Sequence, residues 1–265
     1  MILAERRRKI YDWTLQNGSV SVTWLAERLG VGLNTIRIDL AALDKEGKLM
    51  RSHGGAIIRD SAVGIRMPYS QTRNTNLAEK ALIGQKALEY LPETGTIFLG
   101  PGTTCHQLAI RVPKTHQLHI ITISPQIASF LASQTDNTVD ILGGRVRKDS
   151  DETDVSLSED SLDTLYWDIA FFGVSAIDPV RGITSLDQPT ARYERRILEQ
   201  AARVIVLCDS SKIGKLSYAR VGPVTLMDIL ITDSKLNPDI AADLEGQGIK
   251  IVYADEASGP TGREG

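Results

Sequence analysis

Three runs of apolar residues near the start of the chain have the spacing of amphipathic helices. The first run ends at the pair Asn17–Gly18, the second lies between Ser21 and Gly30, and the third ends before Gly47. Ser21 is a suitable N-cap, and glycine often closes a helix. The apolar positions are Leu3, Ile10 and Trp13, then Val22, Leu25, Ala26 and Leu29, and then Leu33, Ile36, Leu40 and Leu43. The pattern predicts a longer helix followed by two short helices joined by a turn, which is a helix-turn-helix.

The pattern then changes to that of a hairpin followed by a polar segment. Residues 48–59 are β-rich around the pair Gly54–Gly55, and we interpret them as the wing of a winged helix-turn-helix. Residues 59–76 are largely polar, contain glycine and proline, and have no sustained period, which predicts a linker. We therefore assign residues 1–58 to a small winged helix-turn-helix domain, a type of domain that binds DNA.

Beyond the linker, helical patterns alternate with short apolar runs. We expect helices at 77–91, after Thr103 and at 190–202, and strands at 96–99, 118–123, 139–142, 169–174, 204–208, 229–232 and 249–253. Near-continuous apolar strands between helices predict an α/β domain with a mostly parallel sheet covered by helices on both faces. We assign residues 77–256 to this domain, and we expect residues 257–265, which lack apolar content, to be a disordered tail.

Charge is unevenly distributed between the two predicted domains. Residues 1–60 carry ten Lys and Arg against seven Asp and Glu, a balance of +3, whereas the 265-residue chain has a formal net charge of -3. The remainder is therefore at -6. A basic first domain suits a polyanion, although an excess this small only supports such a partner.

The two cysteines and the apolar runs bear on the cellular compartment. Cys105 and Cys208 lack the spacing of a metal site and lie in apolar surroundings, which predicts buried free thiols in a reducing cytoplasm. No apolar run approaches the roughly 20 residues of a membrane span, and no signal-peptide pattern follows the basic start. We therefore expect a cytoplasmic protein without a membrane partner.

The third predicted helix presents a polar face opposite its apolar stripe. At about 100° per residue, this face carries Asn34, Ile38, Ala41 and Lys45, flanked by Thr35 and Arg37. Such side chains can bond base edges and phosphates or contact thymine methyl groups in a major groove. The candidate DNA-binding residues are Asn34, Thr35, Arg37, Ile38, Lys45, and Arg51 and His53 of the hairpin. The same helix face is compatible with protein contacts, and the two hairpin residues with a role in the turn alone.

These segments resemble the DeoR-type helix-turn-helix and its wing. The resemblance rests on residues 31–40 (VGLNTIRIDL) followed at the right separation by residues 51–56 (RSHGGA). It implies binding to a double-stranded DNA operator. Two positions depart from the family pattern, which usually has Ser in place of Gly32 and Arg in place of Ile38. They imply a weaker helix cap and one fewer contact to DNA.

Several loops after predicted strands carry groups suited to a phosphorylated ligand. The loop Gly100–Thr104 combines glycines, two hydroxyls and a helix start, which together could cradle an anion. Loops at the carboxyl ends of parallel strands converge, so Arg145 and Lys212 could pair with a phosphate and Asp209 could accept from sugar hydroxyls. The candidate effector-binding residues are Gly100, Gly102, Thr103, Thr104, Thr122, Ser124, Gly143, Gly144, Arg145, Asp209 and Lys212. Taken singly, each is equally compatible with a tight turn, a solvated charge or a local cap.

The resemblance to the DeoR family continues through the second domain, to about residue 254. It rests on Glu79–Lys80, the loop Gly100–Thr104, Leu142–Gly144, and residues 168–173 and 209–214. It implies a fold like that of ribose-5-phosphate isomerase and CoA-transferases, and a phosphorylated sugar as effector. Four positions depart from the family pattern, namely Gly100, Ile123, Thr190 and Glu194. The identity of the sugar is therefore open.

The leading hypothesis is a transcriptional regulator, a repressor of a carbohydrate-utilisation operon, whose DNA affinity a phosphorylated sugar changes. We expect a homodimer or homotetramer, because a single helix-turn-helix makes few contacts to an operator. An activator would have the same sequence features. The alternative is a sugar-phosphate isomerase or transferase with an accessory DNA-binding domain. Since Gly100 stands where the family usually has Asp, and Asp209 with Lys212 alone is not a mechanism, we predict no enzyme activity, no cofactor and no metal.

Overall fold

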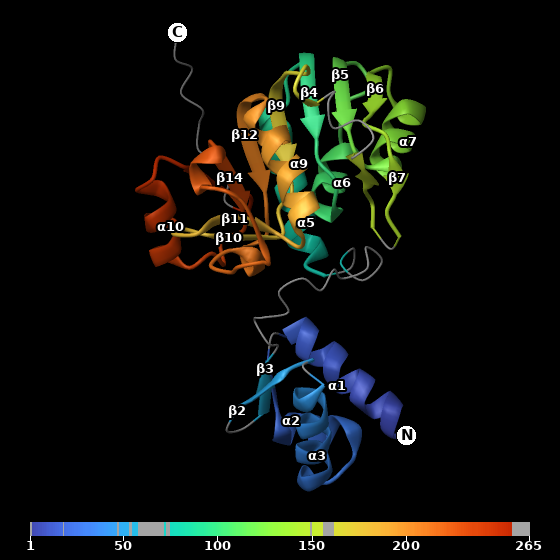
Figure 1. Ribbon diagram of the computed structural model, residues 1–265, viewed down its shortest axis with the longest axis vertical. Helices are drawn as coiled ribbons and strands as arrows, with labels where there is room; N and C mark the ends of the chain where they lie inside the picture. Colours follow the sequence, from blue (N-terminus) through green and yellow to red (C-terminus); the bar gives the residue numbers. More distant parts are fainter. Residues whose placement is uncertain are drawn as a thin grey trace. The chain divides into compact units, whose positions relative to one another are not determined.

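The chain divides into two compact units, Met1–Val63 and Gly64–Gly265, which are described separately. The computed structural model describes residues 2–17, 19–46, 48–52, 55–57, 72, 75–148, 150–155 and 162–255. Figure 1 labels the helices and strands. Most of the predicted linker, and all of the predicted disordered tail at 257–265, lie outside the described residues.

The first unit contains the three predicted helices, α1 (Leu3–Asn17), α2 (Val22–Leu29) and α3 (Leu33–Lys45). The predicted ends of α2 are confirmed. Ser21 Oγ accepts a hydrogen bond from the Trp24 backbone N–H at 3.1 Å, and Gly30 closes the helix with a left-handed φ of 63°. Helix α3 begins after Gly32, which offers no side-chain cap.

A three-stranded antiparallel sheet completes this unit. The predicted hairpin forms from β2 (Met50–Ser52) and β3 (Gly55–Ile57), and a third, unpredicted strand, β1 (Ser19–Ser21), pairs with the other side of β3. A Cβ at Gly55 would lie 1.9 Å from the Val20 carbonyl oxygen, so only glycine permits this approach of β3 to β1.

The core of the first unit contains nearly all of the predicted apolar stripe. Its buried members include Ile10, Leu25, Ile36, Leu40, Leu43 and Leu49. The prediction is wrong for Leu3 and Leu33, which are 50% and 42% exposed. As the first residue of α3, Leu33 lies at the end of the packed face rather than within it.

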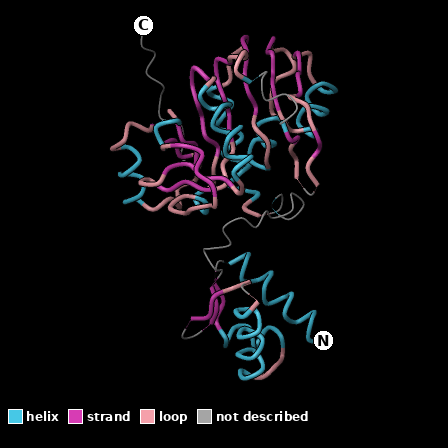
Figure 2. Tube along the Cα trace, viewed as in Figure 1, coloured by secondary structure: helices cyan, strands magenta, loops and turns pink. Residues whose placement is uncertain are grey.

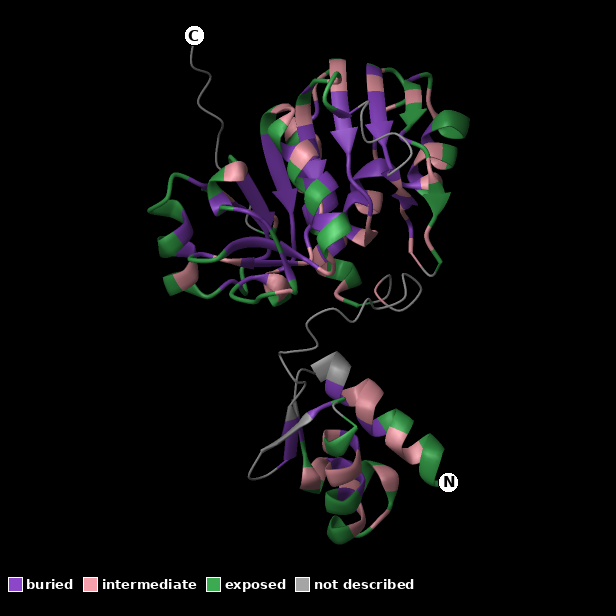
Figure 3. Ribbon diagram, viewed as in Figure 1, coloured by how far each residue is buried: buried purple, intermediate pink, exposed green. Residues whose placement is uncertain are grey.

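The second unit is built on a seven-stranded parallel sheet, which confirms the predicted α/β class (Figures 1 and 2). The strand order is β15-β14-β12-β9-β4-β5-β6, and every neighbouring pair is parallel. The strands are β4 (Thr94–Leu99), β5 (Gln117–Thr122), β6 (Thr138–Ile141), β9 (Trp167–Phe172), β12 (Ala201–Leu207), β14 (Ile229–Thr232) and β15 (Lys250–Tyr253). The central strands are buried, as Figure 3 shows, because helices cover both faces.

Two hydrophobic cores lie on the two faces of this sheet. One contains Ile83 of α5 (Leu77–Ala87), Leu108 of α6 (Thr103–Ala109) and Leu131 of α7 (Pro125–Gln134). The other contains Ile197 of α9 (Gln188–Glu199) and Leu244 of α10 (Pro238–Glu245). Helices α7 and α10 were not predicted, although each begins with proline after a capping side chain.

Smaller elements attach to the second unit. Strands β10 (Ala176–Asp178), β11 (Gly182–Ser185) and β13 (Ala219–Gly222) form an antiparallel sheet, and β7 (Arg145–Val146) pairs with β8 (Thr153–Asp154). The described residues also include the 3-10 turns η1 (Leu88–Tyr90), η3 (Ser210–Lys212) and η4 (Val224–Leu226). None of the helices in the described part of the chain has the length and apolar character needed to cross a membrane.

Both cysteines are buried free thiols, as predicted. Burial raises the pKa of each of Cys105 and Cys208 to about 12, because the thiolate would lose its hydration.

Candidate functional site

A cavity of about 150 Å³ lies in the second unit at the carboxyl ends of its parallel strands. One wall comes from the loops that follow β4, β9 and β12, and the other from the β7–β8 hairpin, the end of β11 and the start of α9. Ligands in open α/β sheets bind at this edge. The volume is below the roughly 300–1,000 Å³ of sites that hold drug-sized ligands. The cavity therefore suits a small metabolite.

The first wall can bind an anion. Lys212 lines the cavity, and its Nζ donates a hydrogen bond to the Val174 carbonyl oxygen at 3.0 Å. Opposite the strand ends, Gly102 adopts a left-handed φ of 97° just before α6, and Thr103 and Thr104 follow it along the cavity. A helix start leaves N–H groups without acceptors in the helix. An ammonium, two hydroxyls and these N–H groups are a suitable set of donors for a phosphate.

Asp209 lies behind Lys212 and is buried. Its Oδ1 accepts hydrogen bonds from Asn76 Nδ2 at 3.0 Å and from the N–H and hydroxyl of Ser211. Burial alone would raise the pKa of Asp209, but the Lys212 ammonium and the hydrogen bonds from Ser211 and Asn76 outweigh it, and the pKa is lowered. Asp209 is therefore an ionised carboxylate, stabilised by the ammonium groups of both Lys212 and Lys80.

Lys80 forms hydrogen bonds with the segment before α5, close to Asp209 and Lys212. Its side chain is buried, and Nζ donates to the carbonyl oxygens of Thr72 at 2.8 Å and Thr75 at 2.7 Å. Burial, together with the nearby Lys212 ammonium, lowers the pKa of Lys80 to about 8. Since Thr72 lines the cavity, the cavity is connected through hydrogen bonds to the part of the chain that leads toward the first unit.

The second wall is acidic. Asp151 is buried, and its Oδ2 accepts a hydrogen bond from Ser124 Oγ at 2.6 Å. Burial raises the pKa of Asp151, and the Ser124 hydrogen bond partly opposes that shift. Glu152 accepts from the Tyr193 hydroxyl at 2.8 Å. Glu194 of α9 is the third carboxylate on this wall.

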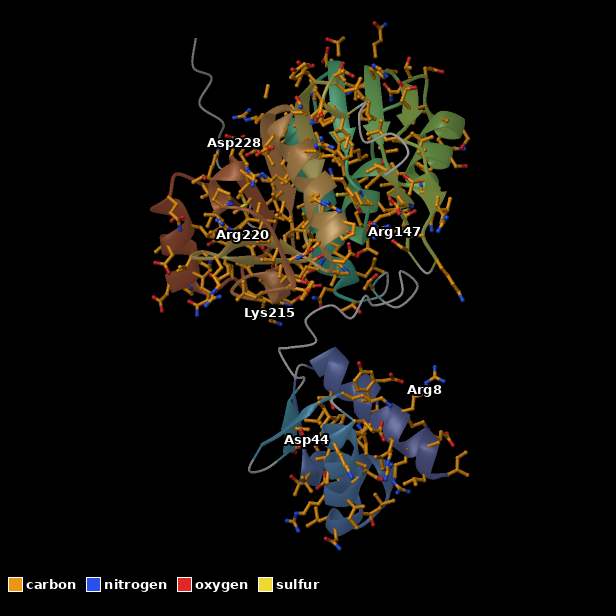
Figure 4. All side chains as sticks on the ribbon, viewed as in Figure 1. Arg8, Asp44, Arg147, Lys215, Arg220 and Asp228 are labelled. Atoms are coloured by element: carbon orange, nitrogen blue, oxygen red, sulfur yellow. The ribbon has the colours of Figure 1, made fainter. Side chains whose placement is uncertain are left out.

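An arginine supports the acidic wall from outside the cavity lining. Arg147 is labelled in Figure 4. Its Nη1 donates to Thr190 Oγ1 at 2.8 Å and lies 3.3 Å from Asp187 Oδ2. Its guanidinium also lies over the Tyr193 ring, 5.7 Å from the centroid. Arg147 therefore positions the first turns of α9.

The structure brings together only part of the predicted effector set. Gly102, Thr103, Thr104 and Lys212 line the cavity. Ser124 and Asp209 lie one layer behind it, beside Asp151 and Lys212 respectively.

The other five predicted effector residues lie away from the lining. Gly100 is buried in the sheet, where a Cβ would be 2.9 Å from the Phe172 ring, and Thr122 is buried and accepts from the Ser124 N–H. Gly143, Gly144 and Arg145 lead from the edge strand β6 into the β7–β8 hairpin, and Arg145 is exposed. These three residues follow the edge strand β6, whereas the loops of the first cavity wall follow β4, β9 and β12.

The cavity residues absent from the predicted set include Asp151, Glu152 and Ser185. Asp151 and Glu152 stand between two-residue strands, for which periodicity gives no signal. Ser185 ends β11, and the sequence does contain a signal for this strand. The β-branched residues before Ser185 follow a turn that contains Pro179, which is typical of a hairpin.

The outer face of α3 in the first unit is arranged as predicted. Asn34, Arg37 and Lys45 are exposed, Thr35 is half-buried, and the Ile38 side chain is 58% exposed. The Arg51 side chain and the whole of His53 lie outside the described residues.

The inner face of α3 changes the charge count of the first unit. Asp39 is fully buried and accepts from Arg6 Nε at 2.6 Å and Arg7 Nε at 3.0 Å. Two of the ten cations counted as available to a polyanion therefore join α1 to α3 instead. Arg8, with a side chain 81% exposed, points to solvent (Figure 4).

No metal centre is found in the described ranges, where no three His, Cys, Asp or Glu side chains form a group that could hold an ion.

The sequence matches two domain families. Residues 6–62 match the DeoR-like helix-turn-helix domain, and residues 75–234 match the DeoR C terminal sensor domain.

Relatives over nearly the whole chain are transcriptional regulators. The HTH-type transcriptional regulator GlpR of Haloferax volcanii is 33% identical over 95% of this chain and 98% of its own length. The glycerol-3-phosphate regulon repressor of Escherichia coli K12 is 28% identical over 87% of this chain and 90% of its own. A solved structure of ribose 5 phosphate isomerase A from Neisseria gonorrhoeae is 16% identical, with a TM-score of 0.37 over 51% of this chain and 52% of the other.

Proposed function

Because the chain belongs to the DeoR family of DNA-binding transcriptional regulators, we propose that it is a cytoplasmic repressor of a carbohydrate-utilisation operon whose operator affinity is set by a phosphorylated sugar in the cavity. The observation that carries this proposal is the convergence of Lys212 with residues 102–104 on one small cavity inside the part matched to the sensor domain. The cavity binds the ligand without turning it over.

The outer face of α3 is the proposed operator-reading surface. Arg37 and Asn34 supply donors to base edges or phosphates, and exposed Ile38 supplies an apolar contact for a thymine methyl group. The ion pairs of Asp39 with Arg6 and Arg7 hold α3 against α1, so that this face keeps a fixed orientation. Thr35 and Lys45 flank this surface. We include Arg51 and His53 of the wing among the proposed DNA-binding residues.

A ligand phosphate at Lys212 would act on the segment that leads to the DNA-binding unit. The Lys212 ammonium stabilises the Asp209 carboxylate, which accepts a hydrogen bond from Asn76. Lys80 donates hydrogen bonds to the carbonyl oxygens of Thr72 and Thr75. A phosphate bound to Lys212 would weaken the attraction between Lys212 and Asp209. This would shift the equilibrium between conformations of the segment 72–76. Two ligands are coupled in this way when each favours a different arrangement of the same segment.

The proposed assembly is a homodimer or homotetramer. Two copies of the α3 face would read two half-sites of a palindromic operator, and an effector that changes their spacing would change the affinity.

The test is DNA binding by the full chain, measured on promoter fragments with and without sugar phosphates. The expected result is a steep fall of affinity with salt and an affinity that changes when ligand is present. Lys212→Ala should weaken ligand binding by roughly 10- to 100-fold, the cost of one charge-assisted hydrogen bond.

Lys215→Ala is the matched control, because Lys215 is exposed three residues further on and outside the cavity lining (Figure 4). DNA binding that does not respond to salt would contradict the regulator. An undiminished ligand response in Lys212→Ala would contradict the assignment of the phosphate, and turnover of the sugar phosphate would contradict a purely sensory cavity.

A further inference from the structure

The charges on the cavity do not match a ligand that is only anionic. Among the described residues that line it, Asp151, Glu152 and Glu194 are acidic and Lys212 is basic. The groups behind the lining do not alter this balance, because Arg147 pairs with Asp187, and Lys80 lies beside Asp209. A phosphate dianion can be held at Lys212, but the rest of its ligand meets a wall of carboxylates.

A second feature of the cavity points to a polar ligand at that wall. Ser185 is fully buried at the end of β11 and lines the cavity, yet its hydroxyl has no hydrogen-bond partner among the residues that the structure describes. A buried hydroxyl without a partner costs folding free energy, so such groups usually bond a ligand or water. Ser185 lies close in the chain to Thr190 and Glu194, which are one turn apart on the buried face of α9.

The acidic wall keeps the capacity to accept further hydrogen bonds. Asp151 accepts from the Ser124 hydroxyl and the Gln126 N–H, and Glu152 accepts from the Tyr193 hydroxyl. A carboxylate has about four lone-pair positions, so it can accept from a ligand as well as from such groups. An ammonium group has three donors and a positive charge, and carboxylates are its strongest acceptors.

Building on the proposed function, we propose that the effector is a phosphorylated amino sugar, with its phosphate at Lys212 and residues 102–104 and its ammonium group against the carboxylates of Glu194, Glu152 and Asp151. Ser185 hydrogen-bonds a hydroxyl or the ammonium of the sugar. Glu194 and Ser185 are then the residues that set specificity, since they contact the part of the ligand beyond the phosphate. An acetylated amine has lost its charge and is bulkier, and so is rejected.

The test is calorimetric titration of the full chain with matched ligands. The probes are glucosamine 6-phosphate, N-acetylglucosamine 6-phosphate and glucose 6-phosphate, with the corresponding three derivatives of galactose. In at least one series, the free amine should bind at least about tenfold tighter than both uncharged analogues, the gain from one charge-assisted contact. Glu194→Gln and Glu152→Gln should each reduce this preference severalfold.

Glu199→Gln is the control, because Glu199 is on the same helix but is exposed, pairs with Arg195 and lies outside the cavity lining. It should keep the preference in full. Equal or tighter binding of the uncharged analogues in both series would overturn the amino-sugar inference and leave the sugar-phosphate proposal standing. Binding of none of the six probes, together with DNA binding that no sugar phosphate alters, would overturn both. The preference is measured on the unaltered protein, so a variant that fails to fold does not remove the test.

Discussion

Asn76 donates a hydrogen bond from its side-chain amide to the carboxylate of Asp209, 3.0 Å away, although the two residues are far apart in the sequence. Asn76 precedes α5 in a left-handed conformation, with φ of 51°. Asparagine tolerates this region better than most residues because its short side chain can bond locally. The contact joins the start of the second unit to the loop that carries Lys212.

Replacing Asn76 with glycine should separate ligand binding from its effect on DNA. Glycine keeps the left-handed backbone and removes the bond to Asp209. We expect the ligand dissociation constant to stay within about threefold, while the ligand-induced change in DNA affinity falls by about 1 kcal/mol, at the lower end of typical couplings. DNA titrations with and without saturating ligand measure the difference.

Asn237→Gly is the control for that variant. Asn237 caps α10 by accepting from the Asp239 N–H at 2.8 Å, and it does not line the cavity. It should leave the coupling unchanged. An Asn76→Gly protein with full coupling would show that the Asp209 contact does not transmit the signal.

Lys80 should give the stability of the second unit a distinctive pH dependence. Its pKa is about 8 in the folded protein, because of burial and of Lys212, against an ordinary value of 10.5. Between these values the unfolded chain binds more protons, so the free energy of unfolding rises with pH through this window. The rise should be about 2 kcal/mol between roughly pH 7.5 and 9.5.

Urea unfolding of the wild type and of Lys80→Met at both pH values checks this. Groups that titrate in both proteins cancel in the comparison, and the methionine variant should lack the rise attributed to Lys80. The same pH dependence in both proteins would mean that Lys80 is not the group responsible.

Asp39→Asn should loosen the first unit. The substitution removes the charge that neutralises Arg6 and Arg7 at a fully buried position. Both arginines can reach water, so we expect a loss of about 2–3 kcal/mol rather than the full cost of a buried unpaired charge. Hydrogen exchange of α1 and α3 in the full chain measures it.

Asp12→Asn is the matched change on the surface of α1. Asp12 is 50% exposed and lies 4.0 Å from Arg8, so its loss should cost less than about 0.5 kcal/mol. Equal acceleration of exchange in the two variants would show that the Asp39 ion pairs do not hold α3 in place.

Arg37→Ala should weaken operator binding. The side chain is exposed on the outer face of α3 and carries a cation suited to a base edge or a phosphate. The expected loss is about 1–3 kcal/mol, with relaxed sequence preference if Arg37 contacts a base, or a salt slope reduced by about one if it contacts a phosphate.

Arg8→Ala removes the same charge from the exposed side of α1 and serves as the comparison. Its effect should be less than about 0.5 kcal/mol, the size typical of surface substitutions. If Arg8→Ala weakened the operator complex as much as Arg37→Ala does, α3 would not be the reading helix.

The helices of the first unit and the central strands of the second could be predicted from the sequence because their signals are local. Leu25, Ile36 and Leu40 repeat with the helical period and are buried, and Ser21 and Gly30 form the predicted caps. Runs such as Ile97–Leu99 are long enough and apolar enough to indicate a strand buried on both faces.

Only the tertiary structure decided which side chains share the cavity. Lys212 and residues 102–104 follow different strands, yet the parallel sheet brings them to one edge. Ser185 and Asp151 reach the same cavity from short antiparallel strands and their connections. In the first unit, Asp39 of α3 forms ion pairs with Arg6 and Arg7 of α1. Periodicity reports which face of an element is buried, whereas these contacts depend on how distant elements pack, and a single sequence contains no local signal for that.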